Sequence, residues 1–290
     1  MDQMSLRAMG KINLGLDVLG KRDDGYHEVR MIMQSVHVYD RLELTKTHDR
    51  KITVKTNRSF LPTDENNLVY KAAKLLIDEY GIDEGIEIDL KKYIPVAAGM
   101  AGGSSDAAAV LYGMNRMYEL GLNEEQLMKH GVKIGADVPF CIMRGTVLSE
   151  GIGEILTPLR SAPDCHVVIA KPGISVSTGH VYTAYDAQEN VVHPDIDGMI
   201  DAINAGDLYA LSGKLSNVLE TVTGKDYPII GQIEDYMKEH GALGAIMSGS
   251  GPTVFGLYDD ENAARATYEG LEANHMAKQL YLTGFYNTSR

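Results

Sequence analysis

The first segment with a clear pattern alternates apolar and polar residues. In residues 11–20 (KINLGLDVLG) apolar side chains occupy the even positions from Ile12 to Val18, and the odd positions begin with Lys11, Asn13, Gly15 and Asp17. A period of two residues predicts a half-buried strand, because successive side chains of a strand point to opposite faces. Lys11 and Asn13 are therefore expected side by side on the polar face. The Asp-Gly pair in the following KRDDGY indicates a turn.

The same patterns divide the rest of the first 160 residues into short elements. Alternating or apolar runs predict strands at 28–38, 41–45, 51–56 and 85–93, and a strand–turn–strand at 144–159. A period of 3.6 residues predicts a helix at 67–80, which Gly81 ends, and another at about 105–119. Asn123 is expected to cap a further helix, with acidic residues suiting its first turn.

The pattern changes at residues 161–163, and we expect a domain boundary near residue 160. The second part begins with an apolar strand at 166–173, followed by helices near 177–187, 207–221 and 228–240. Two strands around a Gly/Ser turn follow within 244–260, then a helix at 261–275 and a closing strand at 279–287. This order predicts an α+β layer sandwich.

The composition argues against a nucleic-acid-binding protein and a membrane protein. The 290 residues carry a formal net charge of −13, from 27 Lys and Arg against 40 Asp and Glu. Non-specific nucleic-acid binding needs a basic surface, so this balance argues against a nucleic-acid partner. No apolar run approaches the roughly 18 residues of a membrane span, and no secretory signal pattern is present. We expect no membrane partner, and the two cysteines, too few for a disulfide framework, fit the reduced cytoplasm.

A glycine-rich loop is the first candidate for chemistry. The stretch PVAAGMAGGSSDAAAVL (95–111) places Gly99, Gly102 and Gly103 before Ser104 and Ser105, at the expected start of a helix. Glycines let the backbone approach a ligand closely, and the first turn of a helix stabilises an anion such as phosphate. The alternative is a glycine turn in which one of the two serines is an ordinary N-cap. The stretch by itself leaves both interpretations open.

Three shorter features are also open when each is taken alone. Asp137 in GADVPF is either a functional acid or a helix cap, with Pro139 near the first helical position. The SGSGPT stretch (248–253) is by itself most often a hairpin turn. Tyr26 and His27 are either incidental surface residues or a pair that stacks on and hydrogen-bonds a nucleobase.

Taken together, three motifs resemble those of the GHMP kinases, the superfamily of galactokinase, homoserine kinase, mevalonate kinase and phosphomevalonate kinase. They are GKINLGLDVLGKRDDGYHEV (10–29), PVAAGMAGGSSDAAAVL (95–111) and SGSGPTVF (248–255). The second resembles the family's phosphate loop, with Ala101 where glycine is common. The resemblance covers nearly the whole chain. It implies an α+β fold of two domains, a ribosomal-S5-like domain at 1–160 and a ferredoxin-like α/β sandwich at 161–290, with ATP and substrate in a cleft between them.

The stretch R-x-D-G-Y-H at residues 22–27 narrows the resemblance, because mevalonate and homoserine kinases do not normally carry D-G-Y-H. The usual A-K-[IL]-N is G-K-I-N here, at residues 10–13. The resemblance implies the branch whose members phosphorylate the 2-hydroxyl of 4-diphosphocytidyl-2-C-methyl-D-erythritol in the non-mevalonate route to isoprenoid precursors.

The resemblance also implies roles for single residues, with ATP as donor and Mg²⁺ bridging its phosphates. Asp137 would be the catalytic base, and Lys11 would hold it ionised and steady the reacting oxygens. The expected ATP contacts are Pro95, Ala97, Gly99, Ala101, Gly102, Gly103, Ser104 and Ser105, with Asn67 and Lys92 on the adenine side. The expected substrate contacts are Asn13, Tyr26, His27, Tyr182, Gly249 and Gly251, with Tyr26 and Tyr182 stacked on the cytosine ring. Ser105 is the expected protein ligand of Mg²⁺.

Other functions are compatible with parts of the sequence. The chain could be another small-molecule GHMP kinase, such as a homoserine or mevalonate kinase, but Tyr26 and His27 argue against this. An RNA-binding module is disfavoured by the negative charge, although the N-terminal fold is shared with a ribosomal protein. A nucleotide sensor without activity could have lost Lys11 and Asp137, which are present. The sequence leaves open whether the protein is a monomer or a homodimer.

Overall fold

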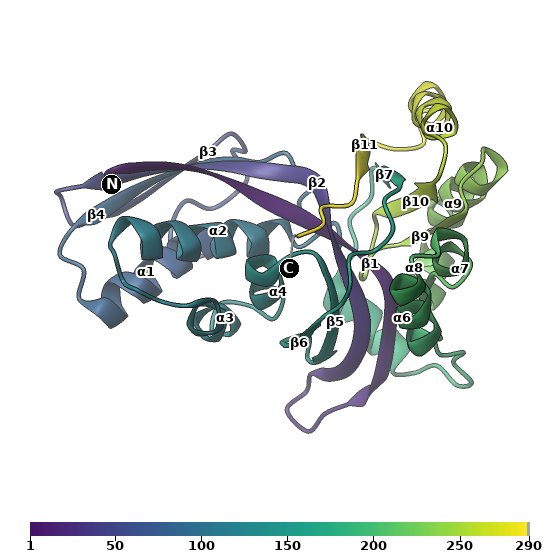
Figure 1. The fold of residues 1–290 in the computed structure, drawn as a ribbon, viewed down its shortest axis with the longest axis horizontal. Coiled ribbons are helices and arrows are strands. Elements are labelled where there is room, and N and C mark those ends of the chain that lie inside the picture. Colours follow the sequence, from purple (N-terminus) through teal and green to yellow (C-terminus); the bar gives the residue numbers. More distant parts are fainter. Residues whose placement is uncertain (289–290) are drawn as a thin grey trace. The chain divides into compact units, whose positions relative to one another are not determined.

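Two long strands, β1 (Gln3–Lys21) and β2 (His27–Thr47), organise the computed structural model, which describes residues 1–288. The chain forms two units, and each is described by itself. The first comprises residues 1–10, 38–96 and 101–143, and the second comprises 11–37, 97–100 and the chain from 144 onward (Figure 1). Both strands contribute residues to both units. A boundary near residue 160 therefore stays a prediction about family domains.

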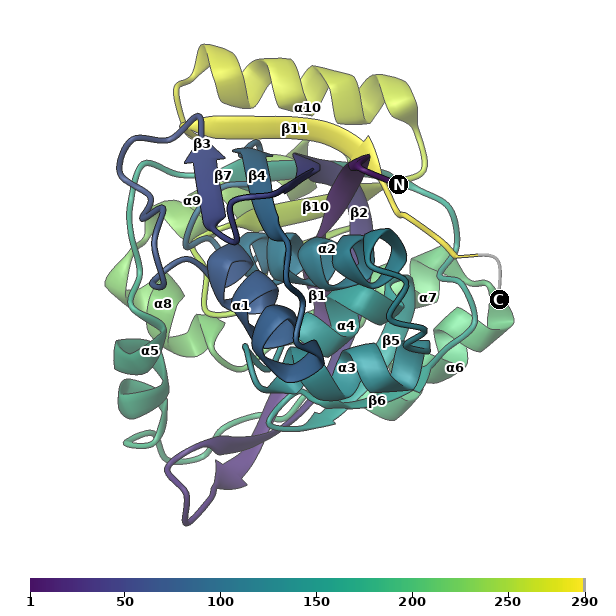
Figure 2. The same ribbon diagram turned by 90° about the vertical axis from the view of Figure 1, so that its left-hand side faces the viewer.

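In the first unit, β2 joins two shorter strands. β4 (Gly85–Lys91) pairs antiparallel with the C-terminal part of β2, and β3 (Ile52–Thr56) pairs parallel with β4. Four helices lie on one side of these strands (Figures 1 and 2); they are α1 (Leu68–Tyr80), α2 (Gly102–Met117), α3 (Glu124–Val132) and α4 (Val138–Met143). Between the two layers lies an apolar core with the fully buried residues Leu42, Leu44, Leu76, Ile86, Ile88, Val110 and Leu111.

Capping residues explain where two of these helices begin and end. Oδ1 of Asn67 accepts a hydrogen bond from the N–H of Val69 (3.1 Å), and Gly81 ends α1 with a φ of 61°. Asn123 and Gln126 form a capping box at the start of α3. Each such cap contributes about 1 kcal/mol to helix stability. The predicted start and end of α1 and the predicted cap of α3 are confirmed.

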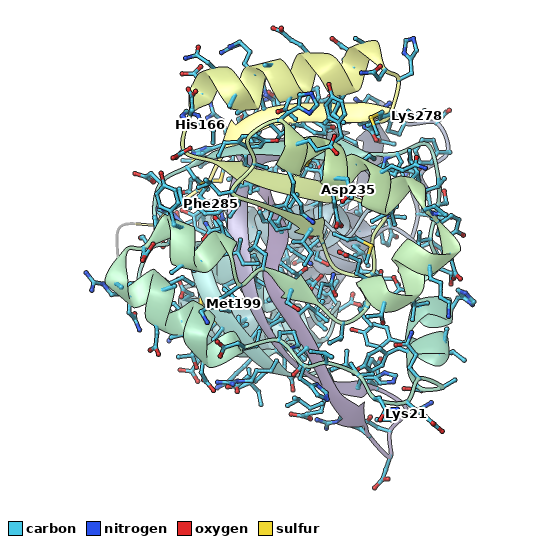
Figure 3. The ribbon with its side chains drawn as sticks, turned by 90° about the vertical axis from the view of Figure 1, so that its right-hand side faces the viewer. Lys21, His166, Met199, Asp235, Lys278 and Phe285 are labelled. Atoms are coloured by element: carbon cyan, nitrogen blue, oxygen red, sulfur yellow. The ribbon has the colours of Figure 1, made fainter. Side chains whose placement is uncertain are left out.

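The second unit contains a four-stranded antiparallel sheet in the order β11-β7-β10-β9. Its strands are β7 (His166–Lys171), β9 (Gly244–Met247), β10 (Val254–Tyr258) and β11 (Gln279–Gly284). Helices α9 (Ile229–Glu239) and α10 (Glu261–Ala273) pack against this sheet and against each other (Figure 3). Strand, helices, two strands, helix and strand follow in the order of a ferredoxin-like fold, which confirms the predicted sandwich.

Shorter elements complete the second unit. They are β5 (Thr146–Gly151), β6 (Ile155–Pro158), β8 (Ser216–Asn217), α5 (Thr178–Tyr185), α6 (Ile196–Ala205), α7 (Leu208–Ser212) and α8 (Glu220–Asp226). α6 packs closely on β1, because a Cβ atom at Gly15 would lie 2.6 Å from Sδ of Met199. Figure 3 labels Met199 on this helix. None of the helices in the described part of the chain is long and apolar enough to cross a membrane.

β2 is one strand of 21 residues where the sequence predicted two. The predicted break included Asp40, which is fully buried. Its carboxylate accepts hydrogen bonds from the ammonium of Lys92 and from the N–H groups of Tyr93 and Ile94. These partners make a buried charge compatible with the strand, and they come from a distant part of the sequence.

β1 is not half-buried, as its alternation predicted. Every residue from 8 to 18 is buried, including the polar positions. Packing of α6 at Gly15 covers part of the face that the sequence assigned to solvent. Alternation therefore identified the strand but not the environment of its polar face.

The helix predicted at 207–221 is interrupted by β8. Nδ2 of Asn217 donates to the backbone oxygens of Met247 and Gly249 (2.8 Å each), and these long-range bonds compete with a helical conformation. α6 was not predicted, although Asp195 caps it and its buried residues recur at helical spacing.

Candidate functional site

Parts of all three motifs meet in the second unit. The ammonium of Lys11 donates to Oδ1 of Asn13 (2.6 Å), so these side chains are neighbours, as predicted. The N–H of Asn13 donates to Oγ of Ser248 (3.2 Å), and this hydroxyl donates to the carbonyl oxygen of Gly99 (3.0 Å). The N–H of Lys11 donates to the carbonyl oxygen of Met100 (3.2 Å). Hydrogen bonds therefore join β1, the glycine-rich loop and the Gly/Ser turn.

Glycine is needed where these segments touch. Gly99 has a φ of 74°, and a Cβ atom there would collide with the backbone oxygen of Ser248. Gly249 has a φ of 61°, and its Cβ would lie 3.3 Å from Cα of Gly99. Gly251 has a φ of 86° and leaves no room for a side chain beside Sδ of Met247. These glycines permit the close packing of backbone on backbone. The contact of Gly249 and Gly251 with a substrate stays a prediction.

The glycine-rich loop enters its helix earlier than the sequence predicted. α2 begins at Gly102 and not near Ser105, because contacts of the glycines outweigh their low helix propensity; a Cβ at Gly102 would lie 3.0 Å from Cγ2 of Ile94. The N-cap is Ala101, with a φ of 51° and no side-chain capping bond. Ser104 lies with Ser105 in the first turn, so the alternative of an ordinary serine N-cap is wrong. This cap leaves first-turn N–H groups to other acceptors, such as phosphate oxygens.

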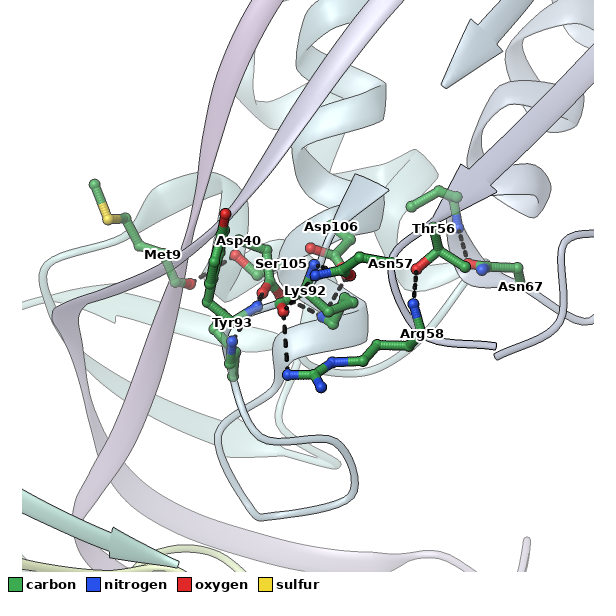
Figure 4. Close-up of polar contacts among 12 residues, drawn as sticks. Met9, Asp40, Thr56, Asn57, Arg58, Asn67, Lys92, Tyr93, Ser105 and Asp106 are labelled. Atoms are coloured by element: carbon green, nitrogen blue, oxygen red, sulfur yellow. Dashed lines mark hydrogen bonds and ion pairs between the residues drawn. The ribbon is translucent and has the colours of Figure 1, made fainter. Parts of the chain in front are cut away.

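A buried ion cluster lies beside the start of α2 (Figure 4). The ammonium of Lys92 donates to Oδ2 of Asp106 (2.6 Å) and to Oδ2 of Asp40, and all three side chains are buried. A Cβ atom at Gly102 would lie 3.1 Å from Nζ of Lys92. The cluster therefore supports the turn in which the predicted phosphate contacts lie. The predicted contact of Lys92 with adenine stays a prediction, and two carboxyl groups already share its ammonium.

The charges of this cluster shift the pKa values of two of its members. Burial raises the pKa of Asp106 well above its usual range, and the nearby Asp40 adds to this effect against the opposing attraction of Lys92. Burial by itself would lower the pKa of Lys92, but its attraction to Asp106 and Asp40 outweighs burial and raises the pKa. Lys92 therefore stays charged between two carboxyl groups, and Asp106 resists ionisation at this buried position.

Two further residues predicted to contact ATP have structural partners. Oγ of Ser105 donates to the carbonyl oxygen of Met9 (2.6 Å), which leaves its lone pairs for a cation; this oxygen donor fits Mg²⁺. Nδ2 of Asn67 donates to the carbonyl oxygen of Pro62 (2.7 Å) while Oδ1 caps α1. Both functional roles stay predictions. Within residues 1–288, no group of three or more His, Cys, Asp and Glu side chains is arranged to hold a metal ion.

Asp137 immediately precedes α4 in the first unit. Its carbonyl oxygen accepts from the N–H of Cys141 (3.1 Å), and its side chain is partly accessible. α4 packs against α2, and a Cβ at Gly135 would lie 4.0 Å from Oγ of Ser104. The turn before Asp137 is therefore near the first turn of α2. This position is compatible with a helix-capping role and with a role in catalysis.

The turn after β1 presents Tyr26 and His27. The N–H of Arg22 donates to the carbonyl oxygen of Tyr26 (2.8 Å), and the N–H of Tyr26 donates to Oδ1 of Asp24 (3.0 Å). Gly25 has a φ of 87°, which favours glycine. These residues of the R-x-D-G-Y-H stretch are thus turn formers. Tyr26 is 59% exposed, which leaves its ring accessible to a ligand.

His27 lies against α5, where its ring centroid is 4.6 Å from that of Tyr182. Its Nε2 lies 2.6 Å from Oδ1 of Asp186, and Oδ2 of Asp186 accepts a hydrogen bond from Lys21 (2.8 Å). The hydrogen bonds from Lys21 and His27 lower the pKa of Asp186 despite an opposing effect of burial, so this group is a carboxylate at neutral pH. The structure therefore brings His27 and Tyr182 together. Sequence reasoning missed Asp186, although it follows Tyr182 by four residues and so shares its helical face.

Comparison with known proteins identifies two family domains. Residues 67–145 match the GHMP kinases N terminal domain, and residues 199–278 match the GHMP kinases C terminal domain. These regions lie on either side of residue 160.

Curated relatives resemble the chain over nearly its whole length. A protein of Lachnospira eligens named 4-diphosphocytidyl-2-C-methyl-D-erythritol kinase is 54% identical over 283 residues, which cover 98% of each chain. A protein of the same name from Lachnoclostridium phytofermentans is 54% identical over 288 residues, or 99% of each chain.

Solved structures resemble the fold. The crystal structure of a 4-(cytidine 5'-diphospho)-2C-methyl-D-erythritol kinase has a TM-score of 0.83 at 30% identity, over 98% of this chain and 100% of that one. A homoserine kinase from Cytophaga hutchinsonii has a TM-score of 0.80 at 20% identity, over 98% and 95% of the two chains. The second likeness concerns the fold alone.

Proposed function

The chain belongs to the GHMP kinase family, and we propose that it transfers the γ-phosphoryl group of ATP to the 2-hydroxyl group of 4-diphosphocytidyl-2-C-methyl-D-erythritol. The observation that carries this proposal is the 54% identity over 98% of the chain with a relative that bears the name of this kinase. The fold by itself does not choose the substrate, because homoserine and mevalonate kinases share it. The reaction belongs to the non-mevalonate route to isoprenoid precursors.

We assign the ATP phosphates to the first turn of α2. The backbone N–H groups of Gly102, Gly103 and Ser104 and the positive end of the helix dipole stabilise phosphate oxygens. The preceding loop, Pro95 to Ala101, shapes the approach to this turn. Ser105 would hold Mg²⁺, which when bound would supply positive charge against the phosphates.

We assign the base to Asp137 and the positive charge to Lys11. The carboxylate of Asp137 accepts the proton of the 2-hydroxyl as that oxygen forms a bond to the γ-phosphorus. The bond from the γ-phosphorus to the bridging oxygen breaks, and ADP leaves with the electron pair. The ammonium of Lys11 neutralises charge on the reacting oxygens, and the amide of Asn13, which accepts from that ammonium, binds the substrate.

We assign the cytidyl group to the turn after β1 and to α5. Tyr26 and Tyr182 stack on the cytosine ring, and each such contact contributes about 1–3 kcal/mol. His27 binds the polar edge of the base. The accessible ring of Tyr26 and the short distance between the rings of His27 and Tyr182 support this assignment.

The proposal is tested by ATP-dependent ADP release with 4-diphosphocytidyl-2-C-methyl-D-erythritol beside mevalonate, homoserine and galactose. We expect turnover only with the cytidyl compound and a product heavier by one phosphoryl group. Turnover of another substrate would support the kinase assignment but contradict the assignment of the cytidyl site. Binding of ATP without turnover of any compound would favour a nucleotide sensor.

The variant Asp137→Asn tests the assigned base. We expect kcat to fall by about 10²–10⁴-fold, with ATP affinity nearly unchanged, because the amide cannot accept the proton. Asp83→Asn is the matched control, because the Asp83 side chain is 83% exposed on a loop of the first unit. Near-native turnover of a folded Asp137→Asn protein would exclude Asp137 as the base.

A further inference from the structure

The contact between His27 and Asp186 determines which ring nitrogen of the histidine carries a proton. A carboxylate can only accept a hydrogen bond, and Oδ1 of Asp186 lies 2.6 Å from Nε2 of His27. The hydrogen must therefore be on Nε2. In a neutral imidazole the other nitrogen, Nδ1, then has a lone pair and is a hydrogen-bond acceptor.

Nδ1 of His27 has no hydrogen-bond partner among the described residues, and the His27 side chain is 10% exposed. Within the described chain, the only hydrogen bond of the His27 ring is the one through Nε2. The ring lies beside Tyr182, which we have assigned to the wall of the base site. An acceptor therefore lies beside the ring to which the base is assigned.

We propose that Asp186 is a positioning residue that fixes His27 with its hydrogen on Nε2, so that Nδ1 selects cytosine over uracil. The argument rests on the proposed function, because it uses the cytidyl site assigned there. Cytosine has an amino group at position 4, which donates a hydrogen bond, whereas uracil has an oxygen there, which accepts one. An acceptor at Nδ1 matches the first base and leaves two acceptors facing each other with the second.

Two further contacts hold this arrangement. The ammonium of Lys21 donates to Oδ2 of Asp186 (2.8 Å), so the carboxylate is oriented through both of its oxygens. The ring of Tyr182 lies at 34° to that of His27, with 4.6 Å between the centroids, which limits rotation of the imidazole. Without Asp186, the hydrogen could move to Nδ1, and the histidine could then donate to the oxygen of uracil.

The experiment compares the binding of cytidine 5′-diphosphate and uridine 5′-diphosphate by calorimetry at pH 8.5. We expect the wild-type protein to prefer the cytidine compound and Asp186→Ala to lose about ten-fold of this preference, the equivalent of one hydrogen bond. Asp226→Ala is the matched control. It removes the carboxylate that lies against a different histidine, His180 of α5, whose Nε2 is 3.1 Å from Oδ2 of Asp226, and should leave the preference unchanged.

A second measurement separates the tautomer from a general loss of structure. The ¹⁵N chemical shifts of His27 report directly which nitrogen carries the hydrogen. We expect an Nε2–H form in the wild-type protein and in Asp186→Asn, whose amide oxygen can still accept, and a mixture in Asp186→Ala. An unchanged preference in Asp186→Ala, or an Nδ1–H form in the wild-type protein, would overturn the proposal. The test is independent of turnover, so failure of the kinase assay alone leaves it in force.

Discussion

The ammonium of Lys92 donates hydrogen bonds to two buried carboxyl groups, so the stability of the first unit should be sensitive to changes at this residue. Asp40 lies in β2, 52 residues from Lys92 in the sequence. Asp106 lies in α2, 14 residues from Lys92. Removal of one partner from a buried ion cluster leaves charge without compensation. Asp40 also accepts hydrogen bonds from the N–H groups of residues 93 and 94, so Lys92 neutralises a carboxyl group that these bonds require.

The variant Lys92→Met keeps the length of the side chain and removes its charge. We expect the free energy of unfolding to fall by about 3–5 kcal/mol, measured by urea denaturation. Lys91→Met is the control, because the neighbouring Lys91 side chain is 46% exposed and its ion pair with Asp89 lies near the surface. Equal stability of the two variants would show that the cluster contributes little.

At the scale of elements, the start of α2 depends on the backbone conformation of one residue, Ala101, which ends the glycine-rich loop and caps the helix. Ala101 is in the left-handed region that favours glycine, with a φ of 51°, and it occupies the position where glycine is common in the resembling phosphate loops. Alanine in this region costs roughly 1–2 kcal/mol. The position of the first turn of α2 therefore depends on a residue that is strained locally.

The variant Ala101→Gly should relieve this strain. We expect a gain in stability of up to about 1 kcal/mol, because the removed strain exceeds the extra entropy that glycine gives the unfolded chain. Ala266→Gly, at an exposed position within α10, is the matched control and should lose about 0.5–1 kcal/mol. Thermal denaturation of the two variants tests the opposite signs. A loss of stability in both would contradict the argument from the backbone of Ala101.

At the scale of the whole molecule, the chain is acidic, with a formal net charge of −13, and one of its buried carboxyl groups resists ionisation. This group is Glu234 on α9. Burial and the nearby Glu220 raise its pKa to about 9, against the weaker attraction of Lys238. Glu220 in turn accepts a hydrogen bond from the N–H of Met247 (2.9 Å), at the end of β9.

The pH dependence of stability follows from this shift. Because the pKa of Glu234 in the folded protein is above its ordinary value of 4.5, its contribution is complete below about pH 4.5 and is lost as the pH rises toward about 9. Glu234→Gln imitates the protonated group. We expect it to match the wild-type protein at pH 5 and to be more stable at pH 9 by at least about 1.4 kcal/mol, the equivalent of one pKa unit.

Urea denaturation at pH 5, 7 and 9 measures this difference. The exposed Glu239, on the same helix, supplies the control Glu239→Gln, which should show no such trend. A constant difference between Glu234→Gln and the wild-type protein across this range would indicate an ordinary pKa for Glu234.

Local patterns in the sequence determined much of this architecture. The period of β1, the caps of α1 and α3 and the order of strands and helices from residue 228 onward depend on residues only a few positions apart, so local patterns were enough to predict them. The three motifs likewise indicated the family, because each is a short run of residues that can be read without its neighbours in space.

Only the tertiary structure decided which distant residues complete each local feature. The ion pair with Lys92 allows Asp40 to be buried within β2. Asn217 is in a strand where a helix was predicted, because its side chain donates to the backbone oxygens of residues 247 and 249. Asp186 gains its importance from His27, 159 residues away. A buried charge lowers stability unless an opposite charge or a hydrogen-bond partner faces it, and a ring nitrogen accepts or donates a hydrogen bond according to the group bound at the other nitrogen. That group is chosen by the fold, since no short-range pattern specifies contacts between segments far apart in the chain.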